Sequence, residues 1–109
     1  MNILITGALG QIGSSLISRL SEVKNVKKVY IIDSLRSNNI NVKFKFNLKK
    51  IKIKFIKADL INKKIFNKIN DRIDYVIHLA SITNAEASFK IKKVLFKNNY
   101  GIFKNIVNF

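Results

Sequence analysis

The sequence contains no cysteine, no proline and no tryptophan, and only six of its residues are acidic. Without cysteine the chain forms neither disulfide bonds nor thiolate metal sites. The single histidine, His78, and the scattered acids show no metal-ligand spacing. No stretch approaches the roughly 18 apolar residues of a membrane span, and the first residues lack the basic segment of a signal peptide. We therefore expect no metal site, no membrane contact and a cytoplasmic location.

The length and the apolar content predict a single globular domain. The chain has 109 residues, of which 48% are hydrophobic. This composition suits a folded chain rather than a disordered one. The length allows a modest core, but it is too short for a cofactor domain followed by a substrate domain.

The net charge of +15 raises the alternative of a small basic module that binds nucleic acid. However, 18 lysines and only three arginines make up the 21 basic residues, whereas a phosphate-reading surface favours the bidentate arginine fork. Abundant Lys, Asn, Ile and Phe instead indicate a bias toward AT-rich codons. The segment for this alternative carries Lys43, Lys45, Lys49, Lys50, Lys52, Lys54 and Lys57. Its alternation places lysines and phenylalanines on opposite faces, whereas base stacking needs both on one face, so nucleic acid is the disfavoured partner.

Hydrophobic periodicity predicts alternating strands and helices. The expected strands are Asn2–Thr6, Val26–Asp33, Ile53–Ala58 and Asp74–Ala80. Helical spacing follows the first strand, with Ile12, Leu16, Ile17, Leu20 and Val23 as the apolar positions. A short amphipathic helix is expected over residues 62–70 and a last helix from Phe89 to the end. This alternation predicts an α/β fold, a Rossmann-like parallel sheet with strand order 3-2-1-4.

Three glycines lie between the first strand and the first helix, at Gly7, Gly10 and Gly13. At such a junction the first glycine permits a tight turn, the second lets backbone N–H groups approach a pyrophosphate, and the third lets helix and strand pack closely. The helix N-terminus then favours the phosphate charge. The absence of a lysine after these glycines excludes a phosphate-binding loop of the G-x-x-x-x-G-K-[ST] type.

An acid at the end of the second strand strengthens this interpretation. Asp33 lies 20 residues beyond Gly13, where a carboxylate can accept hydrogen bonds from the adenosine ribose hydroxyls. Because an acid there also repels a 2′-phosphate, NAD is favoured over NADP as the cofactor. Arg36 weakens this preference for NAD, since its side chain can pair with a 2′-phosphate. The bland alternative for Asp33 is a solvated acid at a strand end.

Four motifs resemble the extended short-chain dehydrogenase/reductases, the NAD-dependent epimerase/dehydratase family. Residues 6–13 (T-G-A-L-G-Q-I-G) are similar to the family's glycine loop, and residues 58–60 (A-D-L) to its acid-plus-apolar pair at the adenine. Residues 76–81 (V-I-H-L-A-S) are similar to its V-I-H-L-A-A, and residues 98–101 (N-N-Y-G) with Asn105 to its N-x-x-G-T-x-N helix. Ser81 departs from an alanine and Ile102 from a threonine, and Asn105 sits one place late.

The resemblance implies a partial NAD(P)-binding Rossmann domain over residues 1–109, without a substrate domain, and it implies residue roles. Gly7, Gly10, Gln11, Ile12 and Gly13 would lie along the pyrophosphate. Asp33 would hold the ribose, Asp59 and Leu60 would flank the adenine, and Leu79, Ala80 and Ser81 would pass near the nicotinamide. Asn98 would contact cofactor or substrate. Bland alternatives are core packing for Leu79 and Ala80, and a helix cap or a lysine pair for Asp59. His78 is expected to be a hydrogen-bonded structural residue.

The family's chemistry is hydride transfer with a tyrosine in Y-x-x-x-K as the acid/base, commonly on a nucleotide sugar. Tyr100 and Lys104 match this spacing, but they overlap the N-x-x-G pattern and no fifth strand precedes them, so we assign no catalytic residue. The sheet is expected to be truncated before its fifth strand. The open edge would then need a second segment, a second chain or self-association, and a nucleotide sugar would bind only once a C-terminal half completes the site. The chain is therefore expected to bind NAD weakly and without turnover by itself.

Overall fold

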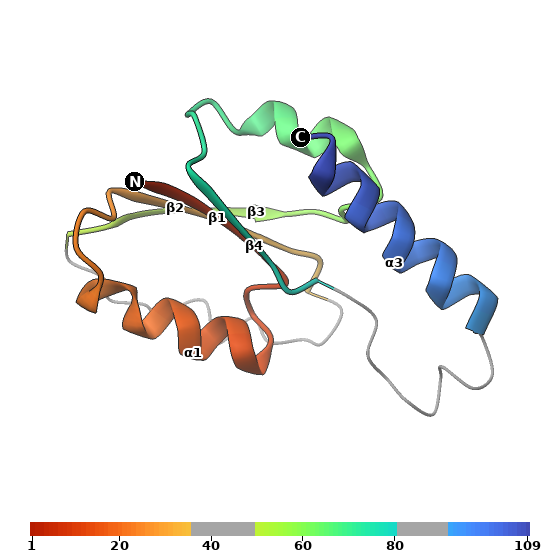
Figure 1. Ribbon diagram of the computed structural model, residues 1–109, viewed down its shortest axis with the longest axis horizontal. Coiled ribbons are helices and arrows are strands. Elements are labelled where there is room, and N and C mark those ends of the chain that lie inside the picture. Colours follow the sequence, from red (N-terminus) through yellow and green to blue (C-terminus); the bar gives the residue numbers. More distant parts are fainter. Residues whose placement is uncertain (36–49, 81–91) are drawn as a thin grey trace.

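The computed structural model in Figure 1 describes residues 1–35, 50–80 and 92–109. Its centre is one parallel sheet with the strand order β3-β2-β1-β4. The strands are β1 (Asn2–Thr6), β2 (Lys28–Asp33), β3 (Lys52–Lys57) and β4 (Tyr75–His78). The predicted strands and their predicted order are confirmed, with ends that differ by one or two residues.

The parallel register sends all four carboxyl ends to one edge of the sheet. Thr6 lies beside Ile32 on one side and beside His78 on the other, and Asp33 lies beside Lys57. The segments that follow these strands therefore emerge next to one another. In sheets of this kind, ligands bind at this edge, where the strand order reverses.

One face of the sheet is covered by α1 (Gln11–Arg19), which continues as the short 3₁₀ turn η1 (Leu20–Glu22). Ile17 and Leu20 pack there against Ile3 and Ile5 of β1. Ile12 also belongs to the expected apolar repeat, but 72% of its surface is exposed. At 3.6 residues per turn, Ile12 points about 140° away from Ile17, so it falls outside the buried stripe. Val23 was also expected on the buried side of this helix, but it follows the end of η1 and is 47% exposed.

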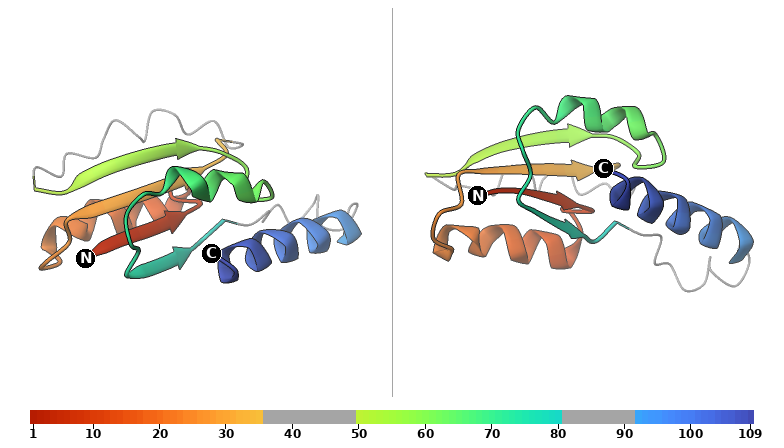
Figure 2. Two further views of the ribbon diagram at one scale, coloured as in Figure 1. Left: turned by 90° about the horizontal axis from the view of Figure 1, so that it is seen from above. Right: turned by 45° about the horizontal axis from the view of Figure 1, so that its top comes forward.

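The other face carries η3 (Lys63–Lys68) and α3 (Lys92–Val107), which lie near each other in both views of Figure 2. The ring of Phe66 in η3 stacks on the ring of Phe109, with 4.6 Å between their centroids. The amphipathic helix expected over residues 62–70 is thus present as a 3₁₀ helix. Its hydrogen bonds span three residues, from Ile65 N–H to the Asn62 oxygen and from Ile69 N–H to the Phe66 oxygen.

The alternation of lysines and apolar residues is retained over the first four residues of β3, from Lys52 to Phe55. Ile53 and Phe55 pack against the core beneath one face, while Lys54 on the other face donates a hydrogen bond to the backbone oxygen of Lys68 at 2.7 Å. Lys43, Lys45 and Lys49 of the basic segment lie outside the described residues. At the end of β3, Lys57 lies two residues after Phe55 and so on the same face, but Phe55 packs against the core instead of standing exposed for base stacking.

Strand β4 forms one edge of the sheet. Within the described strands it pairs only with β1, and Tyr75 and Val76 on it are 59% and 41% exposed. Phe103 and Val107 of α3 are also exposed, at 55% and 65%. The predicted open edge is therefore present in this structure, and α3 exposes apolar side chains as well. In residues 1–35, 50–80 and 92–109, no helix has the length and apolar character needed to cross a membrane.

Candidate functional site

The turn from β1 into α1 requires glycine at its first position. Gly7 has a φ of 65°, a left-handed conformation that side chains rarely adopt. Its N–H donates to the backbone oxygen of Ile32 at 2.9 Å. A Cβ placed on Gly7 would lie 2.6 Å from the backbone nitrogen of Ala80. Gly7 therefore lets the loop after β1 touch both β2 and the segment that follows β4.

Gly13 is also required by the protein's own packing. It lies buried in the first turns of α1, and a Cβ there would lie 2.5 Å from the backbone oxygen of Ala8. Because that neighbour is backbone, it cannot turn aside as a side chain would. Gly13 thus allows α1 to pack directly on the loop that precedes it, whereas the sequence predicts close packing of the helix on the strand.

Gly10 differs from the other two glycines of the loop. Its backbone is extended, with φ −70° and ψ 176°, which any residue can adopt. A Cβ there would meet only the backbone oxygen of Gly7, at the ordinary contact distance of 3.4 Å. Neither conformation nor packing in the described chain therefore demands glycine at position 10. The missing side chain leaves room above the loop for something other than this chain.

The start of α1 presents backbone donors beside that space. Gly10 is the N-cap residue, and no side chain caps the helix there. The first N–H groups of a helix have no partner inside the helix, and its dipole favours a negative charge at this end. Gln11 and Ile12 occupy the first turn with exposed side chains. This arrangement suits a phosphate group bound by backbone N–H groups.

Asp33 ends β2 and its carboxylate holds two backbone segments. Oδ2 accepts a hydrogen bond from the N–H of Leu9 in the glycine loop at 2.9 Å. Oδ1 accepts one from the N–H of Leu35 at 2.8 Å. A carboxylate offers about four lone-pair sites, so it can hold both segments and still accept a ligand hydroxyl. Arg36, which bears on the choice between NAD and NADP, lies outside the described residues.

The turn after β3 contains Asp59 and Leu60. Oδ1 of Asp59 accepts the N–H of Ile61 at 3.1 Å. The side chain that caps η3 belongs to Asn62, which accepts from the N–H of Lys64, so Asp59 does not serve as that cap. Leu60 is 4% exposed and packs in the core, so a ligand at this edge would meet its backbone.

The segment after β4 runs beside the glycine loop. The N–H of Leu79 donates to the backbone oxygen of Thr6 at 3.0 Å, which extends the pairing with β1 by one step. Leu79 and Ala80 are half-buried, and Ala80 forms the wall against which Gly7 packs. Ser81, predicted to follow them in the site, lies outside the described residues.

Asn98 and Ser14 carry buried oxygen atoms without a hydrogen bond. Among the described residues, neither Oδ1 of Asn98 nor Oγ of Ser14 has a hydrogen-bond partner. Leaving a buried polar atom unpaired costs about 1–3 kcal/mol. Asn98 was expected to contact cofactor or substrate, and its unpaired acceptor is compatible with a donor supplied by a ligand. Ser14 carries no signal in the sequence beyond its place one residue after Gly13.

His78 makes the hydrogen bond that the sequence predicts. Its Nδ1 lies 2.6 Å from the hydroxyl oxygen of Thr6, across the β1–β4 pairing. Burial lowers the pKa of His78 below its ordinary value, so the ring is neutral near pH 7. Thr6 was not foreseen as the partner, although its position last in the first strand, as His78 is last in the fourth, was a usable signal.

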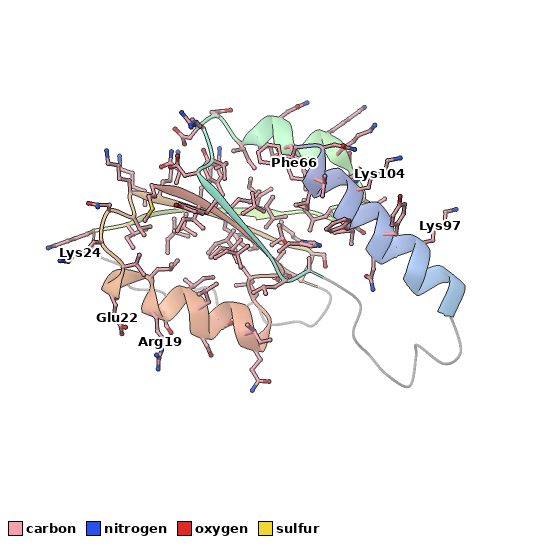
Figure 3. All side chains as sticks on the ribbon, viewed as in Figure 1. Arg19, Glu22, Lys24, Phe66, Lys97 and Lys104 are labelled. Carbon is pink, nitrogen blue, oxygen red and sulfur yellow. The ribbon has the colours of Figure 1, made fainter. Side chains whose placement is uncertain are left out.

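Tyr100 and Lys104 lie on the solvent side of α3. Tyr100 is 57% exposed, and Lys104 projects away from the sheet beside Lys97 (Figure 3). The described contacts thus join three parts of the predicted site. They link the glycine loop to Asp33 through Leu9, and the same loop to Ala80 through Gly7. The pair of Tyr100 and Lys104 is not joined to them by any of these contacts.

Known proteins resemble this chain in sequence and in fold. The model of the family described as "NAD dependent epimerase/dehydratase family" matches residues 3–109. The dTDP-D-glucose 4,6-dehydratase of Dictyostelium discoideum is 36% identical over 100 residues, which are 89% of this chain and 23% of that protein. The ADP-L-glycero-D-manno-heptose-6-epimerase of Fusobacterium nucleatum is 31% identical over 113 residues, 98% of this chain and 31% of that protein.

A solved structure of the UDP-glucose-4-epimerase from Stenotrophomonas maltophila, with bound NAD and formylated UDP-arabinopyranose, superposes with a TM-score of 0.80. The sequence identity is 26%, and the match covers 99% of this chain but 32% of that chain. The chain therefore spans about a quarter to a third of the length of these relatives. With a family model that matches nearly its whole length and with a Rossmann-like fold, this chain belongs to the NAD-dependent epimerase/dehydratase family.

Proposed function

We propose that this chain binds NAD and forms the cofactor-binding portion of an enzyme that acts on a nucleotide sugar. The observation that carries the proposal is Gly10. It is a glycine that neither backbone conformation nor internal packing demands, at the uncapped N-terminus of α1. Because Gly10 has no side chain, a pyrophosphate can lie directly over this end of the helix.

The remaining residues fit the other parts of the dinucleotide. Asp33, already fixed by Leu9 and Leu35, would accept hydrogen bonds from the adenosine ribose. The turn at Asp59 and Leu60 would border the adenine. Leu79, Ala80 and Ser81 would pass beneath the nicotinamide end, and Asn98 would offer its unpaired oxygen to cofactor or substrate. The nicotinamide would serve as hydride acceptor and donor, while these residues bind and orient it.

NAD rather than NADP is the proposed cofactor. The carboxylate of Asp33 would stand beside the ribose 2′ position, where a phosphate on that hydroxyl would meet a like charge. The two backbone N–H groups that Asp33 accepts leave it little freedom to turn away. The epimerase structure from Stenotrophomonas maltophila holds NAD, which supports the same choice.

The nucleotide-sugar chemistry is proposed to need residues outside this chain. Tyr100 and Lys104 have the spacing of a catalytic pair, but both are exposed on α3, and no described contact joins them to the glycine loop or to Asp33. The relatives run about three to four times as long, and β4 and the outer side of α3 expose apolar surface. A further polypeptide segment covering that surface would supply the proton-transfer groups.

The site assignment can be tested by nuclear magnetic resonance on the purified chain. Addition of NAD should shift the backbone amide signals of Gln11, Ile12 and Gly13, since their N–H groups in the first turn of α1 would face the phosphates. The signal of Gly10 should shift too, because the pyrophosphate would lie over this residue, although its N–H donates to the backbone oxygen of Gly7. The amide signals of Asn2 and Asp74 should not shift, because these residues lie at the amino ends of β1 and β4, away from the proposed site. Shifts confined to surface lysines, or shifts that random oligonucleotides reproduce, would contradict the proposal.

The need for a further segment can be tested by turnover and sedimentation. The chain alone should show no epimerase, dehydratase or dehydrogenase turnover with NAD and UDP-glucose. It should also bind an apolar dye or self-associate through its open edge. Turnover that disappears in Tyr100→Phe would show that Tyr100 is catalytic. A cooperative monomer with no dye-binding surface would instead indicate a self-sufficient binding domain.

A further inference from the structure

One side of helix α3 contacts the turn after β3 through Gly101, Ile102 and Asn105. The side-chain nitrogen of Asn105 donates to the backbone oxygens of Leu60 at 2.8 Å and of Ile61 at 3.0 Å. One helical turn earlier, a Cβ on Gly101 would lie 3.0 Å from Cδ1 of Ile61, which is tighter than an ordinary contact. Ile102, between them, packs in the same core cluster as Leu60. The helix thus holds this turn by hydrogen bonds and by close packing.

Within the turn, Asp59 forms two short-range hydrogen bonds. Asp59 accepts the N–H of Ile61 through its side chain and the N–H of Asn62 through its backbone oxygen, at 3.1 and 3.0 Å. These bonds shape the turn locally, and Leu60 packs in the core. Asn105 lies 44 residues away from Ile61, so its amide attaches the backbone of the turn to α3. A primary amide carries two N–H donors, which matches the two consecutive carbonyl oxygens.

The helix register makes this contact specific to position 105. Residues four apart lie on one side of a helix, which places Asn105 in line with Gly101 and above the turn. The neighbouring Lys104 projects to solvent in Figure 3. An asparagine one place earlier would therefore point away from the turn, and the shifted Asn105 of this sequence is the residue able to reach it.

We infer that Asn105 is a positioning residue for adenine recognition, because it fixes the turn that presents Asp59. This inference rests on the proposed binding of NAD. The exocyclic amino group of adenine is a hydrogen-bond donor, and a carboxylate held in a fixed place is a matched acceptor for it. A turn that is ordered before the ligand arrives loses less entropy on binding. Removal of the Asn105 amide should therefore weaken selection of the adenine base.

The test compares two dinucleotides that differ at the base. Wild-type chain, Asn105→Ala and Asn105→Asp are titrated with NAD and with nicotinamide hypoxanthine dinucleotide, in which an oxygen replaces the adenine amino group. Asn105→Asp keeps the size of the side chain but removes both N–H donors. The matched control is Asn108→Ala, an exposed asparagine just beyond the same helix. Thermal unfolding of each variant confirms that it is folded before titration.

Wild-type chain and Asn108→Ala should bind NAD more tightly than the hypoxanthine analogue by about three- to tenfold, the typical effect of one hydrogen bond. Both Asn105 variants should lose most of that preference, through weaker binding of NAD. An unchanged preference in folded Asn105 variants would overturn the inference, since a purely structural role would weaken both dinucleotides equally. Failure of the wild-type chain to bind either dinucleotide would instead refute the proposed function, and this inference with it.

Discussion

The carboxylate of Asp33 accepts the backbone N–H of Leu9 at 2.9 Å, and this bond ties the end of β2 to the glycine loop. The same carboxylate takes the N–H of Leu35 through its other oxygen at 2.8 Å. Asp33 therefore shapes the loop before any ligand is present. A residue proposed to bind ribose is at the same time a structural element of the neighbouring phosphate-binding turn.

Replacement of Asp33 should reduce both stability and affinity. Asp33→Ala removes two charge-assisted hydrogen bonds and should lower the free energy of unfolding by about 1–3 kcal/mol. The matched control is Asp74→Ala. The carboxylate of Asp74 accepts a hydrogen bond from the backbone N–H of Asn2 at 2.8 Å, and it lies at the amino ends of the strands, away from the proposed site. Urea unfolding should show a loss of stability in both variants, whereas calorimetry should show loss of NAD affinity in Asp33→Ala alone. Equal NAD affinity in the two variants would contradict the assigned role.

Discrimination between NAD and NADP should depend on the same carboxylate. The wild-type chain should bind NAD more than about tenfold tighter than NADP, because a 2′-phosphate beside Asp33 meets a like charge. Asp33→Ser removes the charge and keeps a small polar group. It should therefore reduce the difference between the NAD and NADP affinities, mainly by improving NADP binding. Fluorescence titration with the reduced cofactors measures both affinities. Tighter binding of NADP by the wild-type chain would show that another residue sets the specificity.

Gly13 should be a stability position rather than a binding position. A Cβ there would stand 2.5 Å from the backbone oxygen of Ala8, so α1 must shift to admit Gly13→Ala. Overpacking of this kind costs about 1–3 kcal/mol, which exceeds the helix propensity of about 1 kcal/mol that alanine adds over glycine. Equilibrium unfolding in urea should therefore show a clear loss of stability. A variant as stable as the wild-type chain would mean that α1 sits farther from the loop than described.

The half-buried His78 should make stability depend on pH. Burial lowers its pKa in the folded chain, so the unfolded chain binds the proton more readily. The stability that the neutral ring contributes is complete above the unfolded pKa of about 6.5 and is lost as the pH falls through the lower folded value. Between about pH 7 and pH 5 the wild-type free energy of unfolding should decline, and His78→Gln should flatten that decline. An identical pH profile in both chains would exclude His78 as the cause.

The sheet could be predicted from the sequence because its signals are local. Apolar runs such as Asn2–Thr6 end at glycine or at an acid, and right-handed crossovers allow few strand orders. The roles of Gly7 and Gly13 were predictable for the same reason, since the turn and the helix that need them adjoin them in the chain.

Contacts between distant segments could not be predicted in this way. The bonds from Asn105 to the turn after β3 and from Thr6 to His78 join residues 44 to 72 positions apart, and no spacing rule reports them. The exposure of Ile12 depends on where α1 rests on the sheet, and the stack of Phe66 on Phe109 joins η3 to a residue far along the chain. These features follow from tertiary packing, which overrides local propensity.

The most direct test of NAD binding is a calorimetric titration of the wild-type chain and of Gly10→Ala with NAD. The backbone conformation of Gly10 suits alanine, and the added Cβ would lie 3.4 Å from the backbone oxygen of Gly7, an ordinary contact. The free energy of unfolding of the variant should therefore stay within about 1 kcal/mol of the wild-type value, the difference expected at an N-cap. If a pyrophosphate lies over this residue, the wild-type chain binds NAD and Gly10→Ala loses about tenfold or more of that affinity. Equal binding by both chains, or no binding by the wild-type chain, would contradict the account.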